Sequence, residues 1–260
     1  MDVLEKKRAE ASSIHPDEWQ ARVQLAACYR IFDMLGWTEL IYNHITVRLP
    51  GNVTSGAKQF LINPFGLHYG EVTARNLIKI DAQGRILDGS TYPVNPAGFT
   101  VHAALHEGIP DAHCVMHTHT TAGVAVACSE DGLLQSNFYS AQLHERVAYH
   151  DFEGITIRAD EGPRLVEHIG DRRAVILRNH GLLAWGGTVP QAFATLWTLN
   201  RACEIQVATL AMGRARPVPA ALAEQCSRDA LQFDSSYGAG QDIFDALVRR
   251  VDRTDASYRD

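Results

Sequence analysis

The sequence predicts an α/β protein in which helices cover both faces of a mixed sheet. Short runs of β-branched and aromatic residues intermix with helical segments, but they follow no strict β-α-β rhythm. Purely parallel sheets depend on that rhythm, so a mixed sheet between helical layers is the simpler architecture. GxGxxG after a strand and GxxxxGK[ST] are both absent, which argues against dinucleotide and P-loop phosphate binding, and GxSxG is absent too.

The composition is that of an ordinary globular protein. The 260 residues, 46% of them hydrophobic and 21% charged, suffice for one large domain or two small ones. A net charge of -6 without clustered Lys and Arg argues against nucleic-acid partners. No apolar run approaches the ~18 residues of a membrane span, and the charged start is unlike a secretory signal. Five scattered cysteines without CxxC favour a reducing compartment, so we expect a cytoplasmic protein.

The first part of the chain combines one long helix with short strands. Residues 17–36 carry apolar side chains at helical spacing and end in glycine, which predicts a helix. Residues 45–51 and 58–66 are β-branched and aromatic runs closed by Pro-Gly or Pro-x-Gly, which predicts strands. Residues 77–89 predict a hairpin that turns at Gln83-Gly84.

Helices and strands alternate in the middle of the chain. Residues 99–111 predict a helix that glycine and proline stop, and residues 113–120 predict a strand. Residues 121–129 predict a short helix entered through threonine, and residues 154–160 predict another strand.

The last strong pattern is an apolar run followed by the longest helix. The run spans residues 173–186 and is interrupted by polar residues at 179–181; the helix spans residues 189–213 and has proline near its first turn. The pattern weakens from about residue 215. We therefore expect one domain over residues 1–260, with a core at 17–214 and a C-terminal extension at 215–260.

Two histidines stand one residue apart on the strand predicted at 113–120. Residues two apart in a strand project to the same face, so His117 and His119 can reach one metal ion. His180 is the third candidate ligand, because it follows an apolar run and precedes a glycine that lets the backbone come close. Three protein ligands with an open position are typical of catalytic zinc sites. The spacing favours a metal site over one satisfied core histidine with the others at the surface.

Other histidines have weaker patterns. His102 and His106 lie four apart on a predicted helix and could share a metal, although such residues more often form hydrogen bonds where a helix packs on a sheet. His44 begins a strand, and His144 and His150 flank a polar stretch. Each of these three is a proton carrier or a solvent-facing residue, and spacing does not decide which.

Six sequence blocks occur in order along residues 20–213. They are GWTELIYNHITVRLPG, LINPFGLHYGEVTA, VNPAGFTVHAALH, CVMHTHTTAG, VAYHDFEGI and VILRNHGLLAWG. Together they resemble the class II aldolase/adducin family, and the adducin head domain and its bacterial relatives more than the sugar-phosphate aldolases. The resemblance implies an α/β/α sandwich around a mixed, largely antiparallel sheet. It also implies a homotetramer with active sites between subunits, and a divalent metal, usually zinc, held by His117, His119 and His180.

Departures from the aldolases narrow the chemistry that the resemblance implies. In the aldolases a glutamate before the helix histidine is metal ligand and proton carrier, whereas alignment on His102 places Gly98 at that position. The small donors that hold the substrate phosphate in the aldolases are replaced by Asn43-His44, Phe65-Gly66 and Pro96-Ala97. A phosphate dianion would lose its hydroxyl and backbone donors. The resemblance therefore implies a more apolar pocket, suited to an aromatic or other non-phosphorylated acid.

Three functions are consistent with these features. The first is a metal-dependent carbon–carbon lyase, an aldolase or decarboxylase, acting on a non-phosphorylated hydroxy or keto acid through a metal-stabilised enolate. The second is a non-heme iron oxygenase, because the resemblance extends to a few such enzymes, although the usual iron triad includes a carboxylate. The third is a non-catalytic adducin-like assembly protein, which the missing glutamate favours. We expect the lyase, with zinc as the metal and Fe(II) or Mn as alternatives.

The candidate catalytic side chains lie between the two metal-binding stretches. Tyr139 is within one residue of the place from which the aldolases contribute a tyrosine across the subunit interface. Glu145 and His150 fall in, or just before, a block shared with adducin. The alternative is that these residues form a polar subunit interface. We expect Tyr139, Glu145 and His150 to act on a small-molecule substrate.

Overall fold

Seven strands form one mixed sheet in the part of the chain that is described. The computed structural model describes residues 14–50, 58–155 and 160–260, without the side chains of Pro96 and Ala97. The strands are β1 (His44–Arg48), β2 (Gln59–Ile62), β3 (Ile78–Asp81), β4 (Cys114–Thr118), β5 (Val147–His150), β6 (Ala174–Leu177) and β7 (Gly181–Gly186). They lie in the order β3-β2-β1-β4-β7-β6-β5, and every neighbouring pair is antiparallel except β5 with β6.

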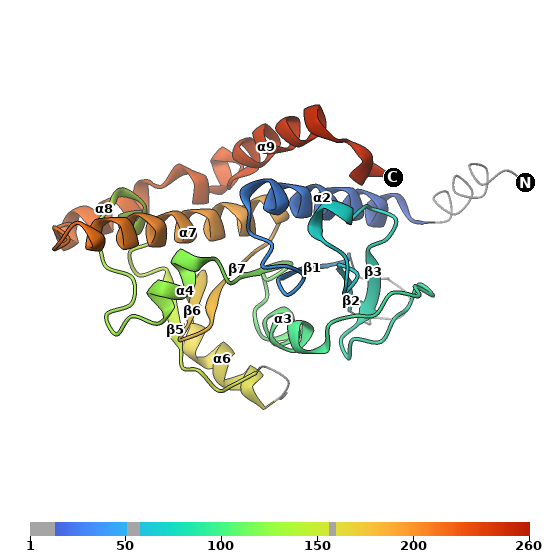
Figure 1. The fold of residues 1–260 in the computed structure, drawn as a ribbon, viewed down its shortest axis with the longest axis horizontal. Helices are drawn as coiled ribbons and strands as arrows, with labels where there is room; N and C mark the ends of the chain where they lie inside the picture. The colour runs from blue at the N-terminus through green and yellow to red at the C-terminus, as the bar shows by residue number, and fades with distance from the viewer. Residues whose placement is uncertain (1–13, 51–57, 156–159) are drawn as a thin grey trace, which may run out of the picture.

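Helices cover both faces of this sheet. The α-helices are α2 (Pro16–Leu35), α3 (Pro96–Gly108), α4 (Thr121–Ala127), α5 (Phe138–Gln142), α6 (Glu161–Ile169), α7 (Val189–Ala211), α8 (Ala220–Asp229) and α9 (Gln241–Thr254). Single 3-10 turns are η1 (Tyr69–Glu71), η2 (Leu231–Phe233), η3 (Ser235–Tyr237) and η4 (Ser257–Arg259). Figure 1 shows α2 and α7 on one side of the sheet and α3 and α6 on the other. The predicted α/β/α sandwich with a largely antiparallel sheet is confirmed.

Alternation along the strands separates the core into two halves. On β4, Met116 packs in the cluster beneath α2 and α7, whereas Val115 belongs to the cluster beneath α3 and α6. On β1, Ile45 faces the α2 side. His44 and Thr46 therefore point towards α3, where they meet polar rather than apolar side chains. One face of β1 thus contributes to the hydrophobic core, and the other face carries polar side chains.

The two long helices begin and end within two residues of the predicted bounds. Helix α2 ends at Gly36, whose left-handed φ of 72° few other residues adopt. Helix α7 begins after Thr188, whose hydroxyl accepts a hydrogen bond from the Gln191 N–H. The predicted hairpin forms only in part. The chain turns at Gly84, with φ 75°, but a single antiparallel bridge between Ile80 and Ile86 takes the place of a second strand.

Several elements are not predicted from the sequence. Strand β5 covers four residues of a polar segment, too few for a clear alternation. Four helices have short or mostly polar sequences: α5, α6, α8 and α9. Their few apolar residues form no clear helical periodicity in the sequence, and only the structure shows which surface these residues cover. Of the strand predicted at 154–160, Gly154 and Ile155 form a bend and residues 156–159 lie outside the described part of the chain. Gly51, at the end of the first predicted strand, lies outside it too.

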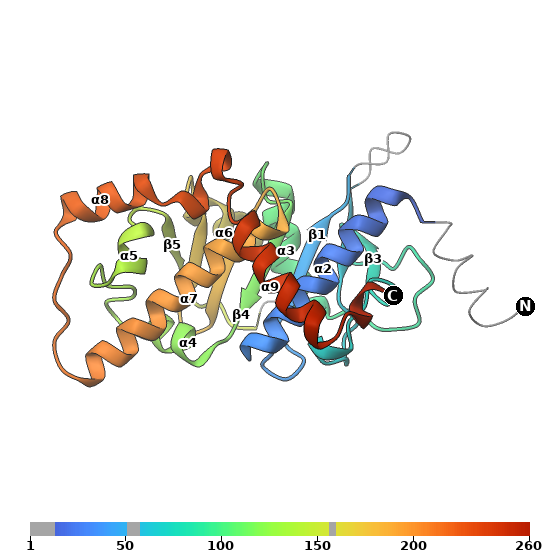
Figure 2. The same ribbon diagram turned by 90° about the horizontal axis from the view of Figure 1, so that it is seen from above.

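The C-terminal segment packs on the sandwich. Helix α9 lies across α2 and α7 (Figure 2), and the chain ends beside α2. The Ala74 N–H donates to the carbonyl of Tyr258 at 2.8 Å, and the Tyr258 side chain is fully buried. No helix of the described residues is long and apolar enough to cross a membrane.

Candidate metal centre

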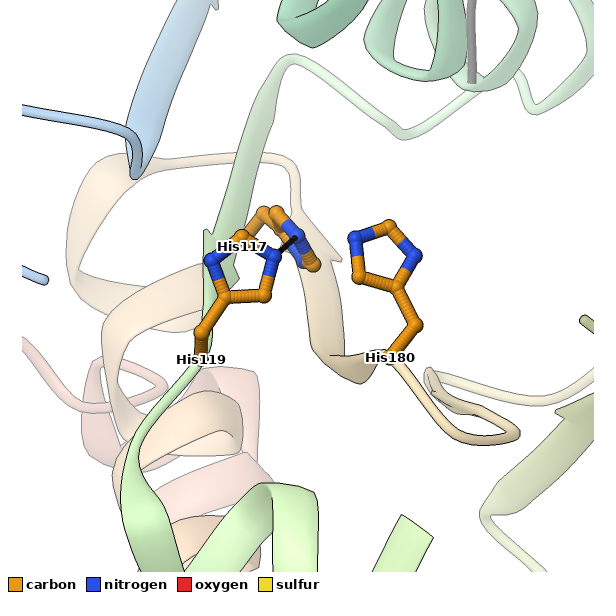
Figure 3. Close-up of side chains that lie close together, drawn as sticks. All are labelled: His117, His119 and His180. Carbon is orange, nitrogen blue, oxygen red and sulfur yellow. Dashed lines mark hydrogen bonds between the residues drawn. The ribbon is translucent and has the colours of Figure 1, made fainter. Parts of the chain in front are cut away.

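Three histidines meet at one end of the central strands. His117 lies on β4, His119 follows the end of β4, and His180 lies in the turn between β6 and β7. Figure 3 shows the three rings facing one another. One nitrogen from each ring lies within 4.8 Å of the others, and no other group of three or more His, Cys, Asp or Glu side chains among the described residues has this geometry. The structure thus brings together the three ligands predicted from the sequence.

The backbone of β7 orients the ring of His117. Its Nδ1 lies 2.9 Å from the Leu182 carbonyl oxygen, which can only accept, so Nδ1 carries the proton and Nε2 the lone pair. Metal-binding histidines usually make such a hydrogen bond with their other nitrogen. His117 Nε2 lies 2.8 Å from His119 Nε2. Ligand nitrogens of a tetrahedral zinc site are roughly 3.3 Å apart for Zn–N bonds of about 2.0–2.1 Å, so a small rotation of the rings fits the ion.

A tight turn places His180 opposite this pair. Asn179 adopts a left-handed φ of 56°, and its N–H donates to the Ala127 carbonyl at 3.0 Å. Gly181 then begins β7. A Cβ atom on Gly181 would lie 2.5 Å from the Thr118 carbonyl oxygen, so glycine is what allows β7 to come this close to β4.

All three rings are neutral at pH 7. Burial lowers the pKa of His119 to about 4, and it lowers the pKa of His180 as well. Burial, and then the neighbouring His119 and His180, lower the pKa of His117 well below its ordinary value. Neutral imidazoles are the form that binds metal ions, so no proton has to leave before an ion enters.

The three histidines line a pocket of about 300 Å³ with largely apolar walls. Val101 and Leu177 line its interior, and Tyr42, Phe152 and Ile155 line its mouth, where each is more than half exposed. No Lys, Arg, Asp or Glu among the described residues lines it. A pocket of this size and character suits a small organic ligand, and these residues give a phosphate group no cationic partner.

The predicted catalytic residues lie in three different places. Tyr139 is half-buried on α5, and Glu145 is exposed in the turn before β5 with φ 58°, and neither lines the pocket. His150 is buried at the end of β5, beside a small cleft that it shares with His180. Its Nδ1 lies 2.8 Å from Nδ1 of His168. Of these three predicted catalytic residues, His150 alone lies near the histidine cluster of its own chain.

His44 and His102 also line the pocket, and the sequence leaves their roles undecided. His44 is the register partner of His117, with ring centroids 5.6 Å apart, and the His102 ring lies 4.1 Å from that of His44. Burial lowers the pKa of His44 to about 4, and the backbone of Tyr42 and of Gly98 acts in the opposite direction. Spacing along the chain predicts which side chains share one face of a strand or helix. The register that pairs His44 with His117 depends on residues far apart in the sequence, so spacing does not predict it.

Comparisons with known proteins identify the family to which the sequence is similar. Residues 23–207 match the sequence model of the family described as Class II Aldolase and Adducin N-terminal domain. A Pseudomonas aeruginosa protein, provisionally named a class 2 aldolase, is 41% identical over 93% of each chain. Alpha-adducin of Rattus norvegicus is 49% identical over 73% of this chain, which is 26% of its own length.

Solved structures of the same kind superpose closely. An aldolase II superfamily protein from Pseudomonas syringae has a TM-score of 0.89 at 39% identity, covering 96% of this chain and 99% of that one. An L-fuculose 1-phosphate aldolase from Glaciozyma antarctica has a TM-score of 0.81 at 26% identity, covering 94% and 93%.

Proposed function

Because the chain belongs to the class II aldolase and adducin family, we propose that it is a metal-dependent carbon–carbon lyase of the aldolase or decarboxylase type. Its substrate is a non-phosphorylated hydroxy or keto acid, with aromatic acids included. The observation that carries the proposal is the cluster of His117, His119 and His180 in a largely apolar pocket.

The three histidines would hold a divalent metal, with zinc as the first candidate and Fe(II) or Mn as alternatives. Such an ion, when bound, polarises a carbonyl group and stabilises the negative charge of an enolate. The Leu182 carbonyl orients the His117 ring, and burial keeps the three rings neutral. Val101 and Leu177 would present apolar surface to the bound substrate.

The proposed substrate class follows from the walls of the pocket. Tyr42 and Phe152 offer aromatic surface at the mouth, which suits an aromatic or other apolar group. A carboxylate or hydroxyl group of the acid would take the position next to the metal. The lack of a cationic side chain among the described lining residues supports a substrate without phosphate.

We further propose a homotetramer with its active sites between subunits. Tyr42, Phe152 and Ile155 are apolar, exposed and at the pocket mouth, where a neighbouring subunit would cover them. Tyr139 and Glu145 do not reach the pocket of their own chain, so they would act in the site of a neighbour. His150 would act beside His180 of its own chain.

The main alternative is a non-catalytic adducin-like assembly protein. Gly98 supplies no carboxylate to the pocket, and the similarity to alpha-adducin extends over most of this chain. An iron oxygenase has less support, because the cluster contains three histidines and no carboxylate, unlike the usual iron triad.

Elemental analysis tests the proposal directly. Protein purified without a histidine tag or chelator should contain close to one zinc per chain, and the double variant His117→Ala/His119→Ala should contain almost none. The exposed His15→Ala variant is the matched control and should keep the metal. Hydroxy and keto acids are then screened for cleavage or CO₂ release. Iron in place of zinc would favour oxygen chemistry, and a wild-type protein without metal would favour the assembly protein.

A further inference from the structure

His44 fills the space beside Gly98 on the pocket wall. A Cβ atom on Gly98 would lie 2.8 Å from His44 Nδ1 and 2.9 Å from its Cε1. Both distances are shorter than van der Waals contact, so a side chain at position 98 and the His44 ring in its present place exclude each other. An imidazole from β1 therefore occupies the space into which a side chain at position 98 of α3 would project.

His44 and His102 carry buried nitrogens that lack a well-formed hydrogen bond, although the backbone of Tyr42 and of Gly98 lies near enough to His44 to raise its pKa. Among the described residues, three buried side-chain atoms without a partner belong to these two rings: His44 Nδ1, His44 Nε2 and His102 Nε2. His44 is 6% exposed, His102 is fully buried, and both line the pocket of the three histidines. A buried polar atom without a partner destabilises a protein, and a bound ligand is one way in which such an atom is satisfied.

A chain of hydrogen bonds decides which nitrogen of His102 is free. His106 Nδ1 lies 2.6 Å from the Ala112 carbonyl oxygen, which only accepts, so the proton of this ring is on Nδ1. The ring is neutral because burial lowers the pKa of His106 to about 3, and its Nε2 therefore accepts from the Thr46 hydroxyl at 2.7 Å. Thr46 Oγ1 in turn accepts from His102 Nδ1 at 2.8 Å. His102 is thus held as the Nδ1–H tautomer, with the lone pair of Nε2 free.

We propose that His44, positioned by His102, accepts a hydrogen bond from the hydroxyl group of a hydroxy acid bound at the three-histidine centre. This inference rests on the proposed function and narrows its substrate class from hydroxy or keto acids to hydroxy acids. The two ring centroids lie 4.1 Å apart, closer than the roughly 5 Å of a linear N–H···N bond between two imidazoles, so the His44 ring has to turn and shift outward to donate its single N–H to the free Nε2 of His102. The other nitrogen of His44 then faces the ligand as an acceptor. Thr46, His102 and His106 are positioning residues.

Two ligands that differ in one hydrogen-bond donor test this subsite. Glycolate and methoxyacetate carry the same carboxylate, but only glycolate has a hydroxyl. Calorimetry on the zinc-loaded protein should show a preference for glycolate, and the His44→Ala variant should reduce that preference about tenfold, or about 1.4 kcal/mol. The His15→Ala variant removes an exposed imidazole that does not line the pocket and should keep the preference. An unchanged preference in His44→Ala would overturn the subsite.

The positioning residues are tested by the protonation state of His102. Nitrogen-15 spectra of the metal-free protein should show His102 protonated at Nδ1. Thr46→Val preserves shape but removes the hydroxyl, so it should disturb this tautomer and weaken the glycolate preference, whereas Thr46→Ser should keep both. A His102 ring protonated at Nε2 in the wild-type protein would overturn the hydrogen-bond chain even if His44→Ala does not fold. Failure of the wild-type protein to bind zinc, Fe(II) or Mn would overturn the proposed function, and the subsite with it.

Discussion

At the scale of single residues, missing Cβ atoms decide which side chains reach the pocket. Gly98 leaves room for the His44 ring, and Gly181 lets β7 close on β4 beneath the rings of His117 and His119. Neither glycine has a positive φ, so space rather than backbone conformation requires them. Such positions look unremarkable in a sequence, because the atoms that require the glycine come from elsewhere in the chain.

The contact between Gly98 and His44 predicts that the effect of Gly98→Ala on the free energy of unfolding changes sign when the His44 ring is removed. Gly98→Ala should destabilise the wild-type protein by about 1–3 kcal/mol, because the new methyl group overlaps the His44 ring. In a His44→Ala background the same change should be neutral or stabilising by up to about 1 kcal/mol, since alanine is the better helix former. Urea unfolding of the four proteins measures the coupling. An equal effect in both backgrounds would contradict the steric account.

His106 predicts a defined dependence of stability on pH. Burial lowers its folded-state pKa to about 3, and Arg48 and Lys58 act in the same direction, while the hydrogen bond to Ala112 opposes them. Since the unfolded histidine has a pKa of about 6.5, the unfolded chain takes up the proton first. Stability is therefore complete above that pH and falls as the pH drops towards 3.

The corresponding measurement compares wild type with His106→Gln, which removes the titrating group. Between pH 7.5 and 5.5, the free energy of unfolding of wild type should fall by about 1.4 kcal/mol more than that of the variant. The pH slope is compared rather than the absolute stability, because the substitution also changes packing against Phe60. Parallel pH profiles would show that His106 is not held neutral.

At the scale of elements, the β4–β7 pair holds the candidate metal centre. Five register pairs join the two strands, and His117 lies opposite Leu183 in this ladder. The Leu182 carbonyl, on the same stretch of β7, receives the His117 Nδ1–H. The turn before β7 then carries His180. The spacing between these two strands therefore sets the distance between the ligands.

A methyl group at the start of β7 should disturb that spacing. In Gly181→Ala the new Cβ would meet the Thr118 carbonyl oxygen at 2.5 Å, and backbone atoms cannot move aside without moving the strands. We expect a loss of about 1–3 kcal/mol of stability and weaker zinc binding, measured by competition with a chelating dye. Gly187→Ala is the control, because its nearest neighbour would be Gln191 Oε1 at 3.4 Å. Equal zinc affinity in all three proteins would contradict this account.

At the scale of the whole molecule, the C-terminal segment closes over the helices of one face. Helix α9 packs on α2 and α7, and Phe244 contributes to the same core cluster as Phe193 of α7. The ring centroids of Phe193 and Phe244 are 6.0 Å apart. This segment contacts the face of the sandwich opposite α3. The proposed core at 17–214 and extension at 215–260 therefore differ in sequence pattern, but residues of the extension pack in the same hydrophobic core.

Truncation of a buried side chain on α9 tests whether the extension stabilises the core. Phe244→Ala should cost about 3–5 kcal/mol in the free energy of unfolding, because the side chain is almost fully buried. The exposed Arg249→Ala on the same helix should stay within about 0.5 kcal/mol of wild type. Both variants should bind zinc as the wild type does. A small effect of Phe244→Ala would mean that the packing of α9 contributes little to the stability of the core.

The sequence by itself determined the features that depend on neighbours along the chain. Strand alternation put His117 and His119 on one face, and helical spacing ending in glycine located α2 up to Gly36. Short-range periodicity reports these directly, since each involves residues within a few positions. The glycine after His180 was likewise visible as the mark of a close backbone approach.

Only the tertiary structure decided which faces meet. The antiparallel register of β1 with β4 places His44 beside His117, and the packing of α3 places His102 above them. Neither Tyr139 nor Glu145 joins the pocket of its own chain, although their place in the sequence lies between the ligands. Register and helix docking depend on the fit of the whole core, so distant residues select them together and no local pattern contains them.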